Sequence, residues 1–491
     1  MSPTLAYGAT LAFDSLDPMR AAWNEASSLV FSRLFAADPR GELRPDLVEA
    51  YHSAPDASRF TFRPRRDVYW HDGQQLRAED IAFTLRVASD PAYEGQVRAR
   101  LRDVRSVEID SEGVVELVLS APAPSTLHAL SRLCVLPSHR FPDGRYEPGV
   151  LDREPVGTGP YRVNERTVGG CSFVRHDAFH LGVAEFERLE LVHVADDAER
   201  ADGVATGRLD LAQVKAQHIA RLTAANGVRV HRLRTRVWRS LLFNLDRPVL
   251  ADSRVRRALS AMIDRDEIVR EALGGFGHAQ FTPVPPTSWA APAPPAESGP
   301  GMAFALLESA GWRRDDAGKW RRGKVPLALR MAYLEVESFR IRASELIRDQ
   351  LLAAGVDATL VPITWSQYLA LDQHGLSGTD FDAIVVGWSG GTDPFENLAS
   401  RYMSGGEYNR QGYSDLEFDR LLAAAAAEPS RTVAKTLYRR AVDIAERDSI
   451  MAPLVSPDYL FAARADLRGF TDVELDSFYE FTQFAYLFRS G

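Results

Sequence analysis

A serine flanked by glycines lies in segment 387–391, which reads Gly-Trp-Ser-Gly-Gly. The spacing matches G-x-S-x-G, in which a serine at a strand-to-helix turn is the nucleophile of an α/β-hydrolase and its acid and histidine partners follow in the chain. The last of the eleven histidines is His374, so none follows Ser389. The required order is absent, which leaves a serine hydrolase as a minor alternative. We predict no catalytic residue and no enzymatic activity.

Metal and cofactor sites are not indicated by the spacing of histidines, cysteines and glycines. His176 and His180 are four residues apart but lie in a strand-to-turn context, and the sequence contains no H-E-x-x-H. Cys134 and Cys171 are the only cysteines, and either one disulfide or two buried thiols fits them. The glycines of segment 157–159 lack the G-x-G-x-x-G pattern of a dinucleotide site. We therefore predict neither a metal nor a cofactor.

Composition limits the class of protein. The chain has 491 residues, of which 45% are hydrophobic and 25% charged, so it is long enough for two or three globular domains. Its net charge of -9 supplies no positive field for nucleic acid or anionic membranes. The longest apolar run, 421–427, is far shorter than the roughly 20 residues of a membrane span. No leader precedes Thr4, so the protein is either cytosolic or exported with its signal removed.

Strand and helix patterns alternate around the serine. The sequence predicts strands at 327–333, 356–361 and 383–386, and helices at 338–354, from Asp415 and from Thr432. This alternation favours an α/β domain with a largely parallel sheet. Thr392 or Asp393 is expected to cap a further helix that has Pro394 at its first position.

The first half of the chain predicts a different mixture of elements. Strand, turn and helix are expected over 5–35, with the helix from 22 to 35. Helix 78–86 and a hairpin of 107–109 with 114–119 indicate a mixed α+β unit over 41–156.

Segments rich in proline and glycine separate the elements predicted after residue 155. Segment 155–160 carries Pro-Val-Gly-Thr-Gly-Pro, after which strands resume at 161–163 and 172–175. An amphipathic helical pattern runs from Ser253 to Ala272. Seven prolines in 281–301 are incompatible with regular structure there.

Five groups of motifs together resemble the extracytoplasmic solute-binding proteins of ABC importers, in the peptide and nickel family. They occur in the order of that family and are spread over almost the whole chain. The segments are 69–73 with 76–81, 155–161, 244–248 with 254–265, 387–397, and 413–422.

The resemblance implies an α/β, two-lobed periplasmic-binding-protein-like fold (type II, large cluster C) with an inserted α+β subdomain in lobe I and a hinge between the lobes. The implied division is lobe I from 1–40, 157–239 and 468–491, the inserted subdomain at 41–156, and lobe II at 240–467. The proline-rich stretch would then be a loop within lobe II.

The resemblance also implies the function. Such a protein captures a peptide or peptide-like small molecule between its lobes and delivers it to a membrane permease by hinge closure. It would act as a monomer outside the cytoplasm, periplasmic or membrane-anchored, with no cofactor and no nucleic-acid partner.

Ligand contacts are implied for the stretch after the Asp17-Pro18 turn and for the glycine-rich loop near Ser389. Charged residues near the helix that begins at Ser338 are further candidates. Asp393 is expected to cap a helix more than to contact ligand. The candidate ligand-binding residues are Trp23, Asn24, Glu25, Glu335, Arg340, Trp388, Ser389, Gly390, Gly391, Thr392 and Asp393.

Two charged positions of the family are absent here. Peptide-binding members place an aspartate where this chain has Gly390 and Gly391, and dipeptide-binding members place an arginine where it has 333–337, Tyr-Leu-Glu-Val-Glu. A free zwitterionic dipeptide is therefore disfavoured. A nickel chelate, an opine or a sugar conjugate remains open as ligand. A ligand sensor would need a helix-turn-helix segment and is less favoured.

Overall fold

The protein is described by a computed structural model that covers residues 4–10, 13, 15–20, 25–37, 43–93, 101–123, 125–285, 288–292, 299–390, 393–470 and 487–489. The chain divides into two compact units. The first comprises 1–234, 426–429 and 459–491, and the second comprises 235–425 and 430–458. The finer division, with an inserted subdomain at 41–156, stays a prediction.

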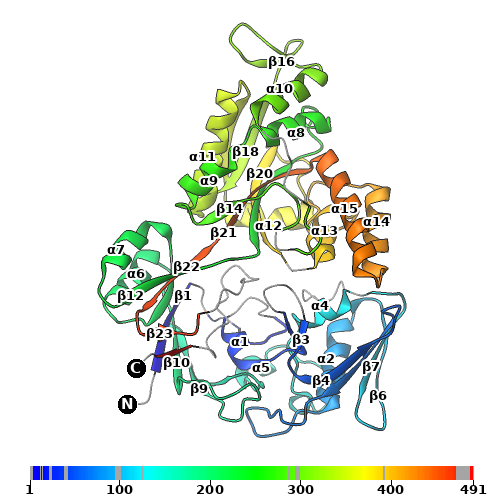
Figure 1. The fold of residues 1–491 in the computed structure, drawn as a ribbon, viewed down its shortest axis with the longest axis vertical. Coiled ribbons are helices and arrows are strands. Elements are labelled where there is room, and N and C mark those ends of the chain that lie inside the picture. Colours follow the sequence, from blue (N-terminus) through cyan, green and yellow to red (C-terminus); the bar gives the residue numbers. More distant parts are fainter. Residues whose placement is uncertain are drawn as a thin grey trace. The chain divides into compact units, whose positions relative to one another are not determined.

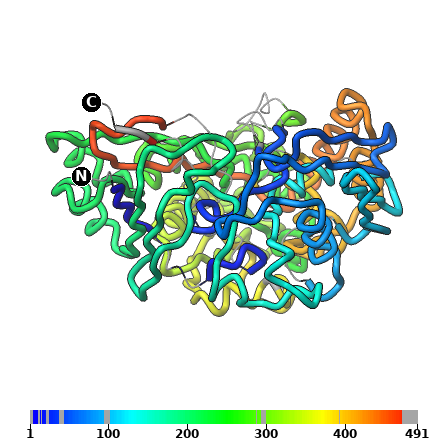
Figure 2. Tube along the Cα trace, turned by 90° about the horizontal axis from the view of Figure 1, so that it is seen from below, coloured from blue at the N-terminus to red at the C-terminus, as the bar shows by residue number. Residues whose placement is uncertain are grey.

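The first unit is built around a seven-stranded sheet of order β12 (Val228–Leu233), β22 (Tyr459–Arg464), β11 (Leu211–Val214), β1 (Thr4–Ala9), β10 (Arg188–His193), β9 (Gly170–Arg175) and β8 (Tyr161–Thr167). Strand β1 runs parallel to β10 and β11, and the other pairings are antiparallel. Because β1 and β22 share this sheet, segments near the two ends of the chain lie in one unit (Figures 1 and 2).

A second, antiparallel sheet of the first unit has the order β4 (Val48–Ser53), β5 (Arg59–Pro64), β7 (Val115–Leu119) and β6 (Val104–Ile109). The hairpin of β6 and β7 confirms the one predicted from the sequence. The remaining elements of this unit are α1 (Glu25–Val30), β2 (Phe35–Ala37), β3 (Leu43–Pro45), α2 (Ala78–Ser89), α4 (Thr126–Leu130), η1 (Ser138–Arg140), α5 (Val150–Arg153), α6 (Asp197–Ala205), η2 (Ala216–His218), α7 (Ile219–Ala224), β23 (Leu467–Arg468) and β24 (Phe488–Arg489).

The second unit contains a six-stranded sheet of order β14 (Gly277–Ala279), β21 (Met451–Pro457), β13 (Val237–Phe243), β20 (Ala383–Ser389), β18 (Ala328–Leu334) and β19 (Asp357–Ile363). The expectation of a largely parallel sheet was wrong, because only the pairings of β18 with β19 and β20 are parallel. The alternation of strands and helices predicted parallel pairs, because parallel neighbours need a crossover connection such as a helix. Strands β13 and β21 instead have antiparallel neighbours, which need no such crossover.

Helices pack on both faces of this sheet (Figure 1). One face carries α8 (Ser253–Ala261), α9 (Arg265–Ala272), α10 (Pro300–Ser309) and α11 (Ser338–Ala353), and the other carries α12 (Trp365–His374), α13 (Pro394–Tyr402), α14 (Leu416–Ala427) and α15 (Arg431–Asp448). Because both faces are covered, β13 is buried along its whole length. A small sheet of β15 (Arg313–Arg314), β16 (Trp320–Arg322) and β17 (Val325–Pro326) completes the unit.

Two predicted helices differ from the structure. The helix expected over 22–35 is described only from Glu25 and ends at Val30, and Phe35 already belongs to β2. The pattern from Ser253 to Ala272 forms two helices instead of one. Asp264 separates them because its side chain accepts a hydrogen bond from the Glu267 amide and so begins α9.

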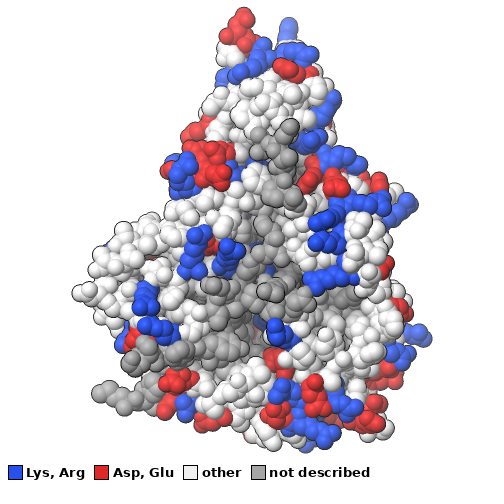
Figure 3. Space-filling view, viewed as in Figure 1, with Lys and Arg blue, Asp and Glu red and all other residues white. Residues whose placement is uncertain are grey.

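Cys134 and Cys171 are both free thiols and both buried. Burial raises the pKa of the Cys171 thiol to about 12. Within the described ranges, no helix is long and apolar enough to cross a membrane. Basic and acidic side chains are interspersed over the face shown in Figure 3, in keeping with the modest net charge.

Candidate functional site

The serine of the glycine-rich stretch lies at the end of a strand. Strand β20 continues through Gly387, Trp388 and Ser389, and Ser389 pairs with Val237 on β13. The sequence had indicated that the strand ends at Val386 and that a loop follows. The chain leaves the strand only at Gly390, so the motif provides a strand end and not the turn of a nucleophile elbow.

Trp388 packs inside the second unit. Its side chain is buried, and its ring centroid lies 5.0 Å from that of Trp238 on the neighbouring strand. The guanidinium carbon of Arg401 lies 5.2 Å from the centroid of each of the two rings. Arg401 also donates hydrogen bonds of 2.9 Å to the carbonyl oxygens of Ser389 and Asn397. This stack ties the end of β20 to α13.

Gly390 and Asp393 shape the start of α13. The Gly390 amide donates to the Arg236 carbonyl at 2.9 Å, and a Cβ at Gly390 would lie 2.6 Å from Oδ1 of Asn397, so only glycine fits without displacement. Asp393 is buried, and its Oδ1 accepts a hydrogen bond of 2.9 Å from the Phe395 amide. Asp393 is thus the N-cap of α13, as its position before Pro394 indicated.

Glu337 holds two arginines together. Its Oε1 accepts a hydrogen bond of 3.2 Å from Nη2 of Arg239, and its Oε2 lies 2.8 Å from Nε of Arg340. Both guanidinium groups are buried, with 7% of Arg239 and 4% of Arg340 exposed. Gly387 permits this arrangement because a Cβ there would lie within 2.6 Å of Nη1 of Arg239. The glycine before the tryptophan therefore makes room for a buried ion pair.

Two guanidinium groups, those of Arg340 and Arg410, lie close to the ring of Tyr368. The guanidinium carbons of Arg340 and Arg410 are 4.5 Å and 4.8 Å from the centroid of its ring. Burial alone would raise the pKa of the Tyr368 hydroxyl, but the positive charges of Arg340 and Arg410 outweigh burial and lower this pKa below its usual value of 10.0. The two guanidinium groups thus favour the ionised form of the Tyr368 hydroxyl.

Arg340 differs from Arg265, another buried arginine of this unit. Arg265 donates to four backbone carbonyls and to the Ser260 hydroxyl, and Arg401 donates to carbonyls as well. Nη1 of Arg340 is also buried but has no hydrogen-bond partner among the described residues. A buried donor without a partner costs free energy, and such groups are rare outside functional sites.

Glu25 lies in the first unit, at the first residue of α1. It is buried and accepts a hydrogen bond of 2.5 Å from the hydroxyl of Tyr7 on β1. Burial, and next the charge of Glu25, raise the pKa of Tyr7 well above 10.0, while Arg200 acts in the opposite direction. The Glu25 carboxylate is thus partnered within the protein.

The candidate residues are therefore distributed over several places. Trp388, Ser389, Gly390 and Asp393 are brought together around the start of α13. Arg340 belongs to the buried arginines beside Glu337, and Glu335 is exposed just after β18. Four further candidates lie outside the described residues, namely Trp23, Asn24, Gly391 and Thr392.

Residues 42–410 match the sequence model of the family described as bacterial extracellular solute-binding proteins, family 5 Middle. The match covers more than half of the chain. The chain belongs to this family. The family assigned from the five motif groups is confirmed.

Relatives of this solute-binding protein share its length. The oligopeptide-binding protein AppA of Bacillus subtilis is 22% identical over 471 residues, which cover 93% of this chain and 86% of AppA. A structure of NikZ from Campylobacter jejuni with Ni(L-His) aligns with a TM-score of 0.83 and 22% identity over 99% of both chains. NikA from Brucella suis with Fe(III)-EDTA aligns with a TM-score of 0.87 and 20% identity over 99% of this chain and 100% of NikA. The predicted two-lobed α/β fold is confirmed.

Sequence reasoning missed most of the buried charge of this solute-binding protein. Tyr368 and Arg401 contact the candidates Arg340 and Trp388 but were not among the candidates themselves. The same is true of Arg239 and Arg410, which contact Glu337 and Tyr368. One signal was available. Arg239 is the one charged residue within β13, an otherwise apolar and polar-uncharged strand, and a charge in such a strand is seldom buried without a specific partner.

Proposed function

We propose that this solute-binding protein captures a peptide or a peptide-like small molecule and delivers it, chemically unchanged, to the permease of an ABC importer. Its family supports this role, and its relative AppA is named an oligopeptide-binding protein. The protein acts as a monomer outside the cytoplasm, periplasmic or membrane-anchored. Trp23, Asn24, Glu335 and the segment 388–393 contribute to the ligand site together with Arg340.

The solute carries an anionic group that contacts Arg340. The observation that carries this proposal is the buried Nη1 of Arg340, which has no partner among the described residues although Nε of the same group lies 2.8 Å from Glu337. A carboxylate or phosphate would satisfy this donor, and hydrogen bonds to charged groups contribute roughly 1.5–3 kcal/mol. The pKa of the Tyr368 hydroxyl is lowered by the same guanidinium group together with that of Arg410, which agrees with a positive potential beside Arg340.

A metal chelate is a second candidate. NikA binds Fe(III)-EDTA in the structure to which this chain is similar, and the carboxylates of such a chelate present the chemistry that Arg340 would recognise. The ligand screen therefore includes chelates of nickel and iron as well as peptides, opines and sugar conjugates.

The first test is a thermal-shift screen, because a ligand that binds only the folded state raises the unfolding temperature. The peptide that gives the largest rise is then prepared with a free C-terminal carboxylate and as its C-terminal amide. We expect the amide to bind the wild type about tenfold more weakly or worse, since 1.4 kcal/mol corresponds to a factor of ten. Calorimetry should find nearly equal affinity for the two forms in Arg340→Gln.

Arg342→Gln is the matched control, because Arg342 lies on the same helix but is exposed and paired with Glu345 at 3.3 Å. This variant should keep the wild-type preference for the carboxylate. If Arg340→Gln preserves the preference too, the anionic group is bound elsewhere. Ser389→Ala should alter binding only modestly and abolish no turnover, and the contact of Arg401 with the Ser389 carbonyl should persist in this variant.

A further inference from the structure

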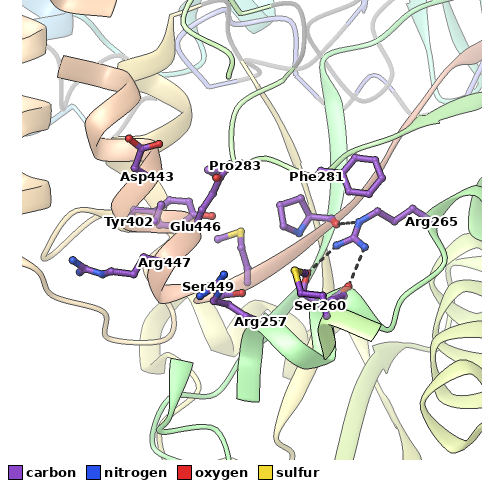
Figure 4. Close-up of a pocket in the computed structure, with 15 residues that line it drawn as sticks. Arg257, Ser260, Arg265, Phe281, Pro283, Tyr402, Asp443, Glu446, Arg447 and Ser449 are labelled. Carbon is purple, nitrogen blue, oxygen red and sulfur yellow. Dashed lines mark hydrogen bonds between the residues drawn. The ribbon is translucent and has the colours of Figure 1, made fainter. Parts of the chain in front are cut away.

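A pocket of about 440 Å³ lies wholly within the second unit, apart from Trp388 and Arg340. Its walls come from α8, the first residues of α9 and α10, the C-terminal ends of α13 and α15, strand β21, and residues that follow β14. Figure 4 shows Asp443, Tyr402 and Glu446 on one side of the pocket and Phe281 with Arg265 on the other. The volume lies within the range of small-molecule sites, which is roughly 300–1,000 Å³.

Two buried arginines hold these walls in place. Arg265 donates to the Gln280 and Pro453 carbonyls at 3.1 Å and 2.8 Å, which fixes α9 to β21 and to the segment after β14. Arg256 on α8 donates to the carbonyls of Asp448 and Ser449 at the end of α15. These hydrogen bonds hold α8 against the end of α15, and α9 against β21 and the segment after β14, so these parts of the wall do not need a ligand to form.

The lining of the pocket combines apolar side chains with hydroxyl groups, among them that of Tyr402. Met302, Met451, Phe281 and Pro283 line it, and such flexible and aromatic side chains suit an apolar ring or chain. Tyr402 also lines the pocket with 2% of its surface exposed. Its hydroxyl makes no hydrogen bond with any residue in the described part of the chain. This hydroxyl is therefore available to a ligand.

The charged residues that line the pocket differ in whether they have an ion-pair partner. Asp443 and Glu446 are three residues apart on α15, and neither forms an ion pair within the described ranges. Burial and the charge of Asp443 raise the pKa of Glu446 to about 7, against the effect of Arg257. Arg447 is occupied by Asp415 at 3.1 Å and by Asp448 at 2.7 Å. Arg265 also lacks an ion pair among the described residues, but it lies on the opposite side of the pocket (Figure 4) and donates to four carbonyls and the Ser260 hydroxyl. The cation other than Arg265 that lines the pocket without an ion pair in the described part of the chain is Arg257.

We propose that this pocket binds a small organic cation, a primary ammonium attached to an apolar ring or chain. The apolar part lies between Met302 and Met451, and the ammonium donates hydrogen bonds to the Tyr402 hydroxyl and to the Glu446 carboxylate. A cation also relieves the repulsion between Glu446 and Asp443. This site is separate from the solute site proposed above, and neither proposal depends on the other.

Methionine methyl signals test the proposal on the full chain. The protein has only 7 methionines, so a sample labelled with [methyl-¹³C]methionine gives few signals, and Met302→Leu and Met451→Leu assign the two of interest. Phenethylamine is titrated first, followed by 3-phenylpropionate, which keeps the ring and replaces the ammonium by a carboxylate. We expect phenethylamine to shift the Met302 and Met451 signals and to bind about tenfold more tightly than 3-phenylpropionate or better.

Two nearly isosteric variants examine the polar contacts. Tyr402→Phe and Glu446→Gln should each weaken phenethylamine binding about tenfold, as loss of a hydrogen bond to a charged group does. Glu345→Gln, on α11 and outside the pocket, is the matched control and should bind like the wild type. Asp443→Asn provides a further variant on the exposed face of α15, should a change at the buried Tyr402 lower the unfolding temperature.

Three results would overturn the proposal. The first is that saturating phenethylamine leaves both methyl signals unmoved. The second is that 3-phenylpropionate binds as tightly as the amine, which would make the pocket merely apolar. The third is that Glu446→Gln and Asp443→Asn both retain wild-type affinity. None of these results bears on the preference for a carboxylate at Arg340, so the two sites can be judged separately.

Discussion

An alanine at Gly387 should disturb the buried pair of Arg239 and Glu337. The added Cβ would lie 2.6 Å from Nη1, 2.8 Å from Cδ and 2.9 Å from Cζ of Arg239, which are all closer than van der Waals contact. Arg239 is 7% exposed and its Nη2 donates to Glu337 at 3.2 Å, so it has no free space to enter. We expect Gly387→Ala to lower the free energy of unfolding by about 1–3 kcal/mol, the usual cost of overpacking.

A double-mutant cycle measured by urea unfolding isolates the cause. In Arg239→Ala the guanidinium is gone, so adding the Cβ at Gly387 should cost less than about 0.5 kcal/mol. The coupling energy between the two sites is then about 1–2 kcal/mol. Gly301→Ala is the control, because a Cβ there meets no atom within 4 Å, and it should not destabilise the protein.

Equal costs of Gly387→Ala in the presence and absence of the Arg239 side chain would refute this reasoning. They would show that the strand itself, and not the guanidinium beside it, needs glycine. The substitution at Gly387 should also affect the proposed ligand site, because Glu337 contacts Arg340 as well as Arg239. Gly387→Ala should therefore weaken binding of the carboxylate peptide more than binding of its amide, as measured by calorimetry.

Three other changes have expected outcomes. Asp393→Ala removes the N-cap of α13 and should lower the free energy of unfolding by about 0.5–2 kcal/mol in urea titration, whereas Asp393→Asn should lower it less. Trp388→Ala empties a buried position and should cost about 3–5 kcal/mol, which a simple ligand-contact role would not produce. Glu446 has a pKa raised to about 7 in the folded state, so its contribution to stability is full below pH 4.5 and is lost as the pH rises towards 7. Wild type should lose stability relative to Glu446→Gln over this range, and parallel profiles would contradict the assignment.

The sequence predicted the elements whose signals are local. Helix α2, the hairpin of β6 and β7, and helix α11 were expected within a few residues of where they occur. Their apolar residues recur with the period of one element, which a single stretch reveals. The sheet order of the second unit was not accessible in this way. Pairing of β13 with β20 and β21 joins residues 140 or more positions apart, and no local pattern records which strands become neighbours.

The start of α13 shows where a local signal was enough for the site. Asp393 before Pro394 predicted a cap, and the structure contains one. The strand end did not follow from the sequence, because the glycine and serine of Gly387-Trp388-Ser389 usually mark turns. Tertiary context overrides this preference here, since the strand pairs with β13 as far as Ser389 and Gly387 gives space to the Arg239 side chain.

The surroundings of Arg340 are unfavourable for a positive charge, which indicates a role in binding and not in stability. It lies in the first turn of α11, a helix of 16 residues, where the helix dipole disfavours a positive charge by about 0.3–1 kcal/mol. Its guanidinium also lies beside the ring of Tyr368, and burial removes solvent from it. Glu337 offsets only part of this, because Arg239 shares the same carboxylate. Arg265 and Arg401, by contrast, hold segments together through backbone carbonyls. An anion in contact with Arg340 would turn an unfavourable arrangement into a satisfied one, and for this reason we place the recognition of the solute's negative charge at Arg340.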